Sequence, residues 1–374
     1  MITVKQVITK KDKREFVKLP FKLYEGNPYW VPPLIKEEMA VFDARKNPTL
    51  ERSEYQLYLA YRKGDSSPVG RIAVMINWDE VEILNKKQVR FGWFEAIDDI
   101  NVTKALIDQA VVLAKKYQFY KIEGPMGFSN LDKVGCLTEG FDKLGTITTW
   151  YTPEYYLKHF EAIGFQTGKQ YIESEFSMLD VDPAPYIKAS RLIKKRYGLR
   201  IKNFTSSDQI MPFVDQMFEL FNSSYSKLDS FVPISKSQID FFKKKYIGFI
   251  NPEYIKFVFN RSNKMVAFVI VMPSFASAMI KAKGKLFPFG FYHLLKAKKE
   301  SKDVVFYLIG IDKDYQKKGV TAIIFEEYYR VFKSKSIKKC IRTPELSDNY
   351  AMHNLWKNFN PKIVKKRKTF VLNI

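Results

Sequence analysis

The sequence predicts a mixed α/β protein made of two domains of similar build. The chain has 374 residues, more than one domain usually contains. Its 46% hydrophobic and 16% aromatic content is typical of packed cores. The order strand, helices, meander, helix, strand, helix, strand occurs in both halves without an obvious residue-level repeat, which suggests a duplication.

The first half is expected to begin with helices and to continue as a sheet. From Asp12 to about Ala40 we expect a helix that is broken at Gly26-Asn27-Pro28, then an extended Pro-Pro segment, and then a second helix. Asn101 is the expected N-cap of a helix whose apolar residues recur at helical spacing. The further elements are strands within 55–77, at 89–98 and at 120–128, and helices at 101–119 and 153–165.

The second half repeats this order after a basic helix at 187–198. We therefore expect domains at 1–178 and 199–374, joined by a linker helix at 179–198. The predicted strands are 199–205, a pair within 254–273, 304–311, 337–346 and 363–374, and the predicted helices are 206–225, 234–249, 319–334 and 349–359.

The charge of the chain favours an anionic partner. The formal net charge is +22, and no Asp or Glu occurs between Glu253 and Glu300 or after Asp348. A nucleic acid, a membrane surface or a phosphate-rich cofactor would fit this charge, and so would a solvated lysine surface that serves solubility.

Two further readings concern location and metals. No apolar stretch has the length of a signal peptide or a transmembrane helix, so we expect a cytoplasmic protein. The two cysteines, Cys136 and Cys340, are far apart and the three histidines are scattered, so we expect neither a disulfide framework nor a metal site.

The most informative stretch is IDKDYQKKGVTA, residues 311–322. It joins an apolar strand to a helix, and a helix start exposes unpaired backbone N–H groups that favour anions. Gly319 would allow a phosphate to approach the backbone closely, and Lys317 and Lys318 add positive charge. The stretch is typical of a pyrophosphate cradle, although glycine is also common at ordinary turns.

This stretch resembles motif A of the GCN5-related N-acetyltransferases (GNATs), which reads Gln/Arg-x-x-Gly-x-Gly/Ala after the fourth strand. Gln316, Gly319 and Thr321 occupy its positions, with Thr321 in place of a smaller residue. Most of the chain is also similar to a bacterial group of tandem acetyltransferases, in the segments NPYWVPPL, FGWFEAID, GPMGFSN, EGFD, FVP, GKLFPFGF and QKKGV.

The resemblance implies a GNAT fold in each half and an acyl-coenzyme A site in the second. In the family, the loop amides bind the pyrophosphate, the splayed fourth strand pairs with the pantetheine arm, and an Asn often follows the fifth strand. The residues at these places are Leu308, Ile309, Gly310, Ile311, Gln316, Lys317, Lys318, Gly319, Val320, Thr321 and Asn349.

Two departures from the family bear on mechanism. Trp356 and Phe160 stand where many members carry a tyrosine that protonates the leaving thiolate. The first half also has acidic residues in place of the glycine-rich loop, and these would repel a pyrophosphate. We therefore expect the first half to have lost or altered coenzyme A binding.

Acyl transfer further needs an oxyanion donor and a base. The donor could be the backbone N–H near Ile309. Glu345 and Asp348, which follow the fifth strand, are the candidate bases, although Ser347 or Asp348 could instead cap the next helix. His353 on that helix could relay a proton or be structural.

These observations favour an acyl-coenzyme A-dependent N-acyltransferase, with acetyl-coenzyme A or another acyl-coenzyme A as co-substrate and a small-molecule or peptide amine as acceptor. A tRNA-dependent aminoacyltransferase of related tandem fold and a non-catalytic coenzyme A-binding protein remain alternatives. The acid-free segment around GKLFPFGF could be a lid, contact an acyl chain, rest on an anionic surface or stack bases.

Overall fold

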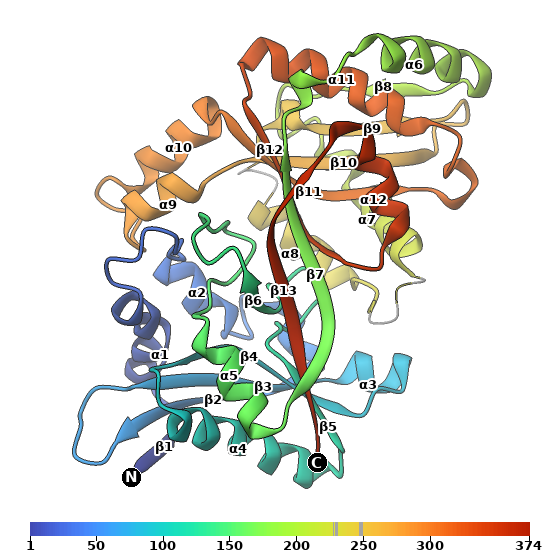
Figure 1. Cartoon of the computed structure of the whole chain (residues 1–374). Helices are drawn as coiled ribbons and strands as arrows, with labels where there is room; N and C mark the ends of the chain where they lie inside the picture. The colour runs from blue at the N-terminus through green and yellow to red at the C-terminus, as the bar shows by residue number, and fades with distance from the viewer. Residues whose placement is uncertain (227, 229–230, 247–249) are drawn as a thin grey trace. The chain divides into compact units, whose positions relative to one another are not determined.

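The computed structural model describes residues 1–226, 228, 231–246 and 250–374 (Figure 1). The chain divides into two compact units. Unit 1 comprises Met1–Ile172, Ala276–His293 and Val364–Ile374, and unit 2 comprises Glu173–Phe275 and Leu294–Ile363. These units differ from the predicted domain ranges, because Ala276–His293 and Val364–Ile374 belong to unit 1. The domain ranges 1–178 and 199–374 stay a prediction. The predicted linker helix is the helix α6 (Ala184–Tyr197) and lies within unit 2.

Unit 1 is built on a mixed sheet in the order β1-β2-β3-β4-β5-β13-β7, with β6 beside β13. β4 and β5 run parallel, and β13 is antiparallel to β5. The C-terminal strand of the chain is therefore part of the first unit's sheet. The strands are β1 (Ile2–Gln6), β2 (Ser53–Arg62), β3 (Gly70–Asn77), β4 (Gln88–Ala96), β5 (Lys121–Gly124), β6 (Cys136–Glu139), β7 (Gln166–Phe176) and β13 (Lys362–Asn373).

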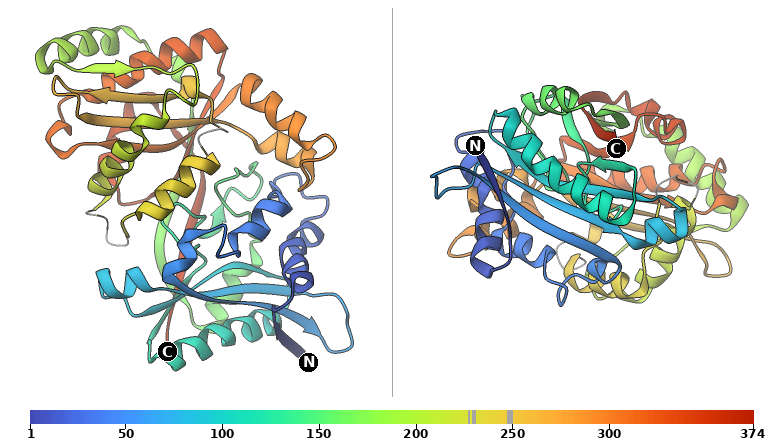
Figure 2. Two further views of the ribbon diagram at one scale, coloured as in Figure 1. Left: turned by 180° about the vertical axis from the view of Figure 1, so that it is seen from behind. Right: turned by 90° about the horizontal axis from the view of Figure 1, so that it is seen from below.

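Helices cover both faces of this sheet, with α4 on one face and α1 and α2 on the other (Figures 1 and 2). The alternation of β3 explains both cores: Ile72 and Val74 pack with α4, whereas Ala73 and Met75 pack with α1. The helices are α1 (Lys10–Leu23), α2 (Ile35–Val41), α3 (Trp78–Leu84), α4 (Ile100–Tyr117), α5 (Tyr155–Ile163) and, from the acid-free segment, α9 (Ala276–Ala282).

Unit 2 repeats the arrangement. Its sheet has the order β12-β11-β10-β9-β8, with the end of β7 next to β12. Its core joins β10 and β11 to α11 and to the aromatic residues Trp356 and Phe359. The strands are β8 (Arg200–Lys202), β9 (Ile255–Phe259), β10 (Met265–Pro273), β11 (Asp303–Ile311) and β12 (Lys339–Leu346), and the helices are α6, α7 (Val214–Tyr225), α8 (Lys236–Tyr246), α10 (Gly290–Glu300), α11 (Val320–Lys335) and α12 (Tyr350–Trp356).

Most predicted elements are present, and several details were wrong. Asp99, not Asn101, caps α4, because its carboxylate accepts from the Asn101 N–H at 3.0 Å. The helix predicted at 206–225 begins as α7 only at Val214, after a 3₁₀ turn at Met211–Phe213. The strand predicted at 120–128 ends at Gly124, before Pro125, which has no N–H to donate. Of the helix predicted at 234–249, residues 247–249 lie outside the described residues.

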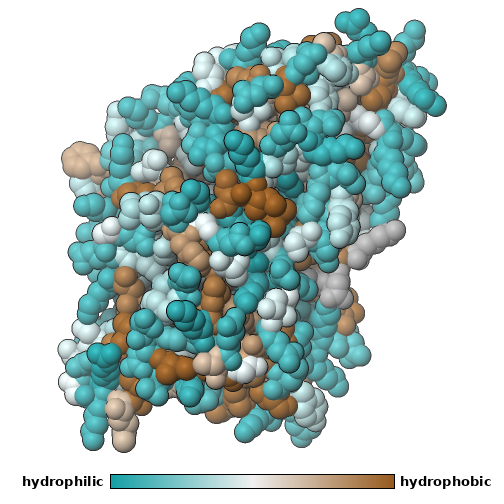
Figure 3. All heavy atoms as spheres, in the orientation of Figure 1, coloured by the Kyte–Doolittle hydropathy of each residue, from teal (hydrophilic) through white to brown (hydrophobic). Residues whose placement is uncertain are grey.

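On the face drawn in Figure 3, hydrophilic side chains predominate and hydrophobic ones form separate small patches. Within the described ranges, no helix is long and apolar enough to cross a bilayer. No group of three or more His, Cys, Asp or Glu in those ranges could hold a metal ion.

Lys256 in β9 is a buried amine whose charge opposes folding. Its side chain is 1% exposed, and its ammonium donates to Oδ1 of Asn203 at 2.6 Å. Burial lowers the pKa of Lys256 to about 8. Because this pKa lies below that of the unfolded chain, the unfolded state binds more protons between the two values. The free energy of unfolding therefore rises with pH in that window, by about 1.4 kcal/mol per pH unit.

We expect Lys256→Met to remove this pH dependence. Urea unfolding of both proteins at about pH 8 and about pH 9.5 should show the wild type gaining about 2 kcal/mol relative to the variant. Equal changes in the two proteins would contradict a lowered pKa at this lysine.

Candidate functional site

The strands β11 and β12 of unit 2 part along their length. They pair in parallel only from Asp303 opposite Lys339 to Phe306 opposite Arg342. β11 then continues to Ile311 beside β10, whereas β12 continues to Leu346. The predicted contact residues Leu308, Ile309, Gly310 and Ile311 all lie on the part of β11 that β12 has left. No strand pairs with this part of β11 on the side of β12, although side chains already donate to the carbonyls of Ile309 and Ile311.

The loop after β11 ends at a helix start that no side chain caps. Gly319 is the N-cap of α11, with a left-handed φ of 76°. The backbone N–H groups of Lys317, Gly319, Val320 and Thr321 find no hydrogen-bond acceptor in the part of the chain that the structure describes. Four unpaired amides at the positive end of a 16-residue helix can bind an anion.

Side chains around the loop leave it positive and accessible. Gln316, Lys317 and Lys318 are exposed, and Nζ of Lys318 lies 5.4 Å from the centre of the Tyr197 ring. The acidic residue Asp312 is neutralised, because its carboxylate lies 2.8 Å from Nζ of Lys264. The fit at Gly319 is tight: an added Cβ would lie 2.6 Å from Cδ1 of Ile193 on α6.

Tyr225, at the end of α7, holds the open strand and was missed by the sequence reasoning. Its hydroxyl donates to the Ile309 carbonyl at 3.0 Å. Burial, and next the nearby Glu345 carboxylate, raise the pKa of Tyr225 to about 12. The phenol therefore stays protonated and fixes the backbone at Ile309. The amphipathic pattern of the helix gave no sign that its last tyrosine reaches another strand.

The two candidate bases have different surroundings. Glu345 is 14% exposed and forms a two-point ion pair with Arg342, of which one contact, Nε to Oε1, measures 3.0 Å. Burial raises the pKa of Glu345, against the opposing effects of Arg342 and His353. Asp348 is exposed to solvent. Glu345 is thus the carboxylate that shares the neighbourhood of Tyr225 and His353.

Helix α12 presents two polar ring atoms without a partner. Asn349, not Ser347 or Asp348, caps this helix by accepting from the Met352 N–H. Nε2 of His353 and Nε1 of Trp356 are both buried, and neither finds a hydrogen-bond partner among the described residues. An unpaired buried N–H costs free energy, so these atoms are available to a ligand or to water.

Unit 1 lacks both features of this junction. β4 and β5 pair only from Gln88 to Arg90, but the space beyond is closed, because the Met126 N–H donates to the Phe91 carbonyl at 2.8 Å. A Cβ on Gly92 would lie 2.2 Å from the Met126 carbonyl oxygen. The N-terminus of α4 is already capped by the carboxylate of Asp99.

A buried polar cluster stands in unit 1 instead. Glu95 accepts from the hydroxyls of Tyr24 and Tyr156 and lies 3.6 Å from Arg71. Burial raises the pKa of Glu95, which Arg71 and the two phenols partly oppose. The guanidinium of Arg71 also donates to the Phe16 carbonyl at 2.7 Å. These bonds connect α1, α5 and the sheet, so the cluster fits a structural role.

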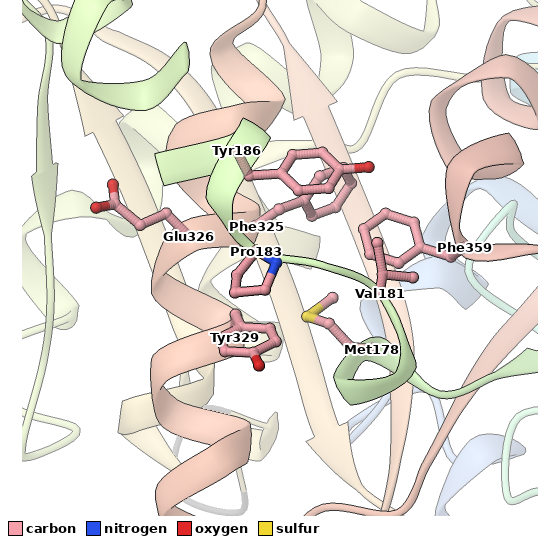
Figure 4. A pocket seen from close by; sticks show the side chains of 8 residues that line it. All are labelled: Met178, Val181, Pro183, Tyr186, Phe325, Glu326, Tyr329 and Phe359. Atoms are coloured by element: carbon pink, nitrogen blue, oxygen red, sulfur yellow. The ribbon is translucent and has the colours of Figure 1, made fainter. Parts of the chain in front are cut away.

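A small hollow elsewhere in unit 2 contains no predicted site residue (Figure 4). Its one charged group, Glu326, already accepts from Ser190 and from Lys194. The hollow is therefore a packing gap. It is lined by Met178, Val181, Pro183, Tyr186, Phe325, Glu326, Tyr329 and Phe359.

Comparison with known proteins gives two relatives in sequence and a match in fold. No family model matches the chain. Protein YghO of Escherichia coli K12 is 26% identical over 377 residues, which cover 98% of this chain and 94% of that protein. A bacterial ceramide synthase of Caulobacter vibrioides is 25% identical over 319 residues, which cover 84% and 82% respectively.

One of the solved structures that match in fold is a tandem GNAT protein from the clavulanic acid biosynthesis pathway. The two structures superpose with a TM-score of 0.59 at 8% identity, over 100% of this chain and 98% of the other. The chain has a tandem GNAT fold. The fold predicted from the QKKGV loop and the repeated element order is thus confirmed. Counted from β8, β11 and β12 are the fourth and fifth strands of unit 2, and α11 follows the stretch that resembles motif A.

Proposed function

We propose that the chain is an acyl-coenzyme A-dependent N-acyltransferase whose unit 2 binds the donor. The observation that carries the proposal is the parting of β11 from β12 beside a helix start with four unpaired amides. The unpaired stretch of β11 could pair with an extended arm that carries amide groups, and the unpaired amides at the start of α11 could bind a pyrophosphate. Coenzyme A carries both groups in one molecule.

Each part of the site has a distinct role in this proposal. Leu308, Ile309, Gly310 and Ile311 would pair with the pantetheine arm. Lys317 and Lys318 would add charge to the cradle of amides from Lys317 to Thr321. Gln316 and Asn349 would line its approach, although the Asn349 side chain also caps α12. In unit 1, a capped helix and a closed strand gap argue against a second donor site of this kind.

The proposed reaction transfers the acyl group from sulfur to nitrogen. The amine nitrogen attacks the thioester carbonyl, the C–N bond forms, the C–S bond breaks, and the departing thiolate takes a proton from solvent. The Ile309 N–H would donate to the developing oxyanion, and Tyr225 would position it through the Ile309 carbonyl. Glu345 would accept the amine proton directly or through His353, because it is the nearby carboxylate that is largely shielded from solvent.

The Caulobacter relative favours a particular version of this reaction. Its name, ceramide synthase, describes formation of an amide on a long-chain amino alcohol. We accordingly propose a lipid amine as a second candidate acceptor, with a long-chain acyl-coenzyme A as donor, beside acetyl-coenzyme A and a small amine or peptide. The cytoplasmic location inferred from the sequence stays a prediction.

Calorimetric titration and an assay of thiol release would test this function together. We expect acetyl-coenzyme A or palmitoyl-coenzyme A to bind, and sphinganine or a small polyamine to trigger thiol release. Glu345→Gln should lower kcat by about 100-fold or more, since general bases typically contribute that much. The exposed Asp348→Asn should retain wild-type turnover and serves as the matched control. Binding without thiol release for any amine would identify a non-catalytic protein. Absence of binding would contradict the proposal and direct attention to aminoacyl-tRNA.

A further inference from the structure

The part of the acid-free segment that belongs to unit 1, Ala276–His293, contacts the first helices of that unit. The Ile35 N–H donates to the Gly284 carbonyl at 2.9 Å. Gly284 lies against Phe21, because an added Cβ would be 2.5 Å from that ring. The Phe291 N–H donates to the Leu286 carbonyl at 2.7 Å and closes the turn into α10. The loop between α9 and α10, orange in Figure 1, is therefore anchored by backbone hydrogen bonds at Gly284 and Leu286.

This attached loop presents its largest apolar side chains to solvent. Phe287 is 75% exposed and Phe289 is 70% exposed, while Gly290 between Phe289 and Phe291 is buried. Phe291 and Tyr292 are 44% and 55% exposed. Rings that face water in this way stand out, because most large apolar side chains of the unit are in its two cores.

Lysines precede these rings at every second position. Lys281, Lys283 and Lys285 are exposed, and the intervening Ala282 and Gly284 are buried. Over the residues that the structure describes, none of the three lysines forms an ion pair with an acidic side chain. No Asp or Glu occurs between Glu253 and Glu300, so the segment has no acid of its own. Exposed rings thus stand beside positive charge that nothing in the segment neutralises.

We propose that this loop docks unit 1 on an anionic lipid bilayer. Phenylalanine and tyrosine rings enter the boundary between headgroups and acyl chains, and lysines next to them are attracted to anionic headgroups. The patch consists of Lys281, Lys283, Lys285, Phe287, Phe289, Phe291 and Tyr292. A bilayer fits it better than a nucleic acid, because the patch contains no arginine and its most exposed rings are phenylalanines, which bring apolar area without polar groups. The proposal does not rest on acyl transfer.

Cosedimentation of the full chain with lipid vesicles tests the proposal. We expect binding to vesicles of phosphatidylcholine mixed with phosphatidylglycerol, and binding at least about tenfold weaker to phosphatidylcholine alone. Phe287→Ser with Phe289→Ser should weaken binding to the anionic vesicles about tenfold or more. Lys283→Glu with Lys285→Glu should abolish the preference for anionic lipid.

Matched controls lie on the exposed face of α4 and just beyond it. Val112 is 63% exposed and Tyr120 is 71% exposed, so Val112→Ser with Tyr120→Ser removes comparable apolar area elsewhere in the unit. Lys104→Glu with Lys115→Glu makes the same charge change at exposed positions. Both control pairs should bind anionic vesicles as the wild type does.

Three results would overturn the proposal. The wild type could fail to bind the anionic vesicles, or the loop variants could bind as well as the controls. The chain could instead bind a tRNA or duplex DNA probe and not bind vesicles. If only the loop variants then lost nucleic-acid binding, the patch would be a nucleic-acid site. Thermal unfolding of every variant at the wild-type temperature ensures that lost binding reflects the patch.

Discussion

Gly319→Glu is expected to abolish acyl-coenzyme A binding, lowering the affinity by at least about 100-fold. The new carboxylate would stand within the amide cradle, at the N-cap of α11, where the pyrophosphate is proposed to bind, and the two negative charges would repel each other. The side chain would also press against α6, because a Cβ at this position lies 2.6 Å from Cδ1 of Ile193. The affinity for the donor is measured by titration calorimetry, as for the wild type.

Gly319→Ala is the control that separates charge from backbone strain. Both variants place a Cβ at a φ of 76° and near Cδ1 of Ile193, so both meet the same local cost, about 1 kcal/mol for the left-handed backbone. Only the glutamate adds charge and length. We expect the alanine variant to bind within about tenfold of the wild type. A folded Gly319→Glu protein with wild-type affinity would place the donor somewhere other than this loop.

Ile193→Ala tests the same region from the other side. Ile193 on α6 lies where a Cβ of residue 319 would go, so shortening it should restore part of the stability that Gly319→Ala loses. It should not restore donor binding to Gly319→Glu, because the repulsion by the carboxylate remains. Comparison of each double variant, Ile193→Ala with Gly319→Ala or with Gly319→Glu, with its single variants therefore divides the loss of stability and of donor affinity into a packing part and an electrostatic part.

Apolar spacing and turn residues predicted the helices and strands of this fold well, because these patterns depend only on residues close together in the sequence. The apolar run of β11, the glycine and the helical spacing of α11 together indicated the strand–loop–helix junction, and the parting of β11 and β12 is where the resemblance placed it. Three strands of the first unit were not predicted. β1 is short, β6 has four residues, and β7 is rich in polar residues with much of its surface exposed.

The contents of the site depend on contacts that sequence patterns do not carry. Nothing near Tyr225 indicates that its hydroxyl reaches the carbonyl of Ile309, which is 84 residues away in the chain. The pairing of Glu345 with Arg342 was also unforeseen, although the two are close in sequence, because alternation along β12 does not show which charges are buried. Burial, rather than residue type, now separates Glu345 from the exposed Asp348.

The difference between local sequence patterns and tertiary contacts also explains why the sheet that contains the C-terminal strand was not predicted. Its alternating pattern predicted a strand at 363–374, but a strand pattern does not say which sheet it joins. The structure pairs Phe370 with Gly124 and Asn373 with Lys121, so the strand belongs to unit 1. Which sheet this strand joins is determined by tertiary contacts between residues that are far apart in sequence.

A fragment of residues 1–178, the predicted first domain, is therefore expected not to fold cooperatively. It lacks β13, which lies between β5 and β7 in the sheet of unit 1, and it lacks the segment Ala276–His293. Without β13 the facing edges of β5 and β7 would lose their backbone hydrogen-bond partners, and the core would lose Phe370. Circular dichroism during urea titration would show a broad, non-cooperative change in the fragment, and the full chain would show a sharp transition.

The contribution of one side chain of that strand can be measured in the full chain. Phe370 is fully buried, and its ring centre lies 4.8 Å from that of Phe160. Phe370→Ala should lower the free energy of unfolding by about 3–5 kcal/mol, because it leaves a cavity among aromatic rings. Ile363→Ala on the same strand is the control: that side chain is 54% exposed, so the expected change is within about 0.5 kcal/mol. If the fragment unfolded as sharply as the full chain, and Phe370→Ala cost no more than Ile363→Ala, unit 1 would not need its C-terminal strand. The predicted range 1–178 would then describe a domain that folds on its own.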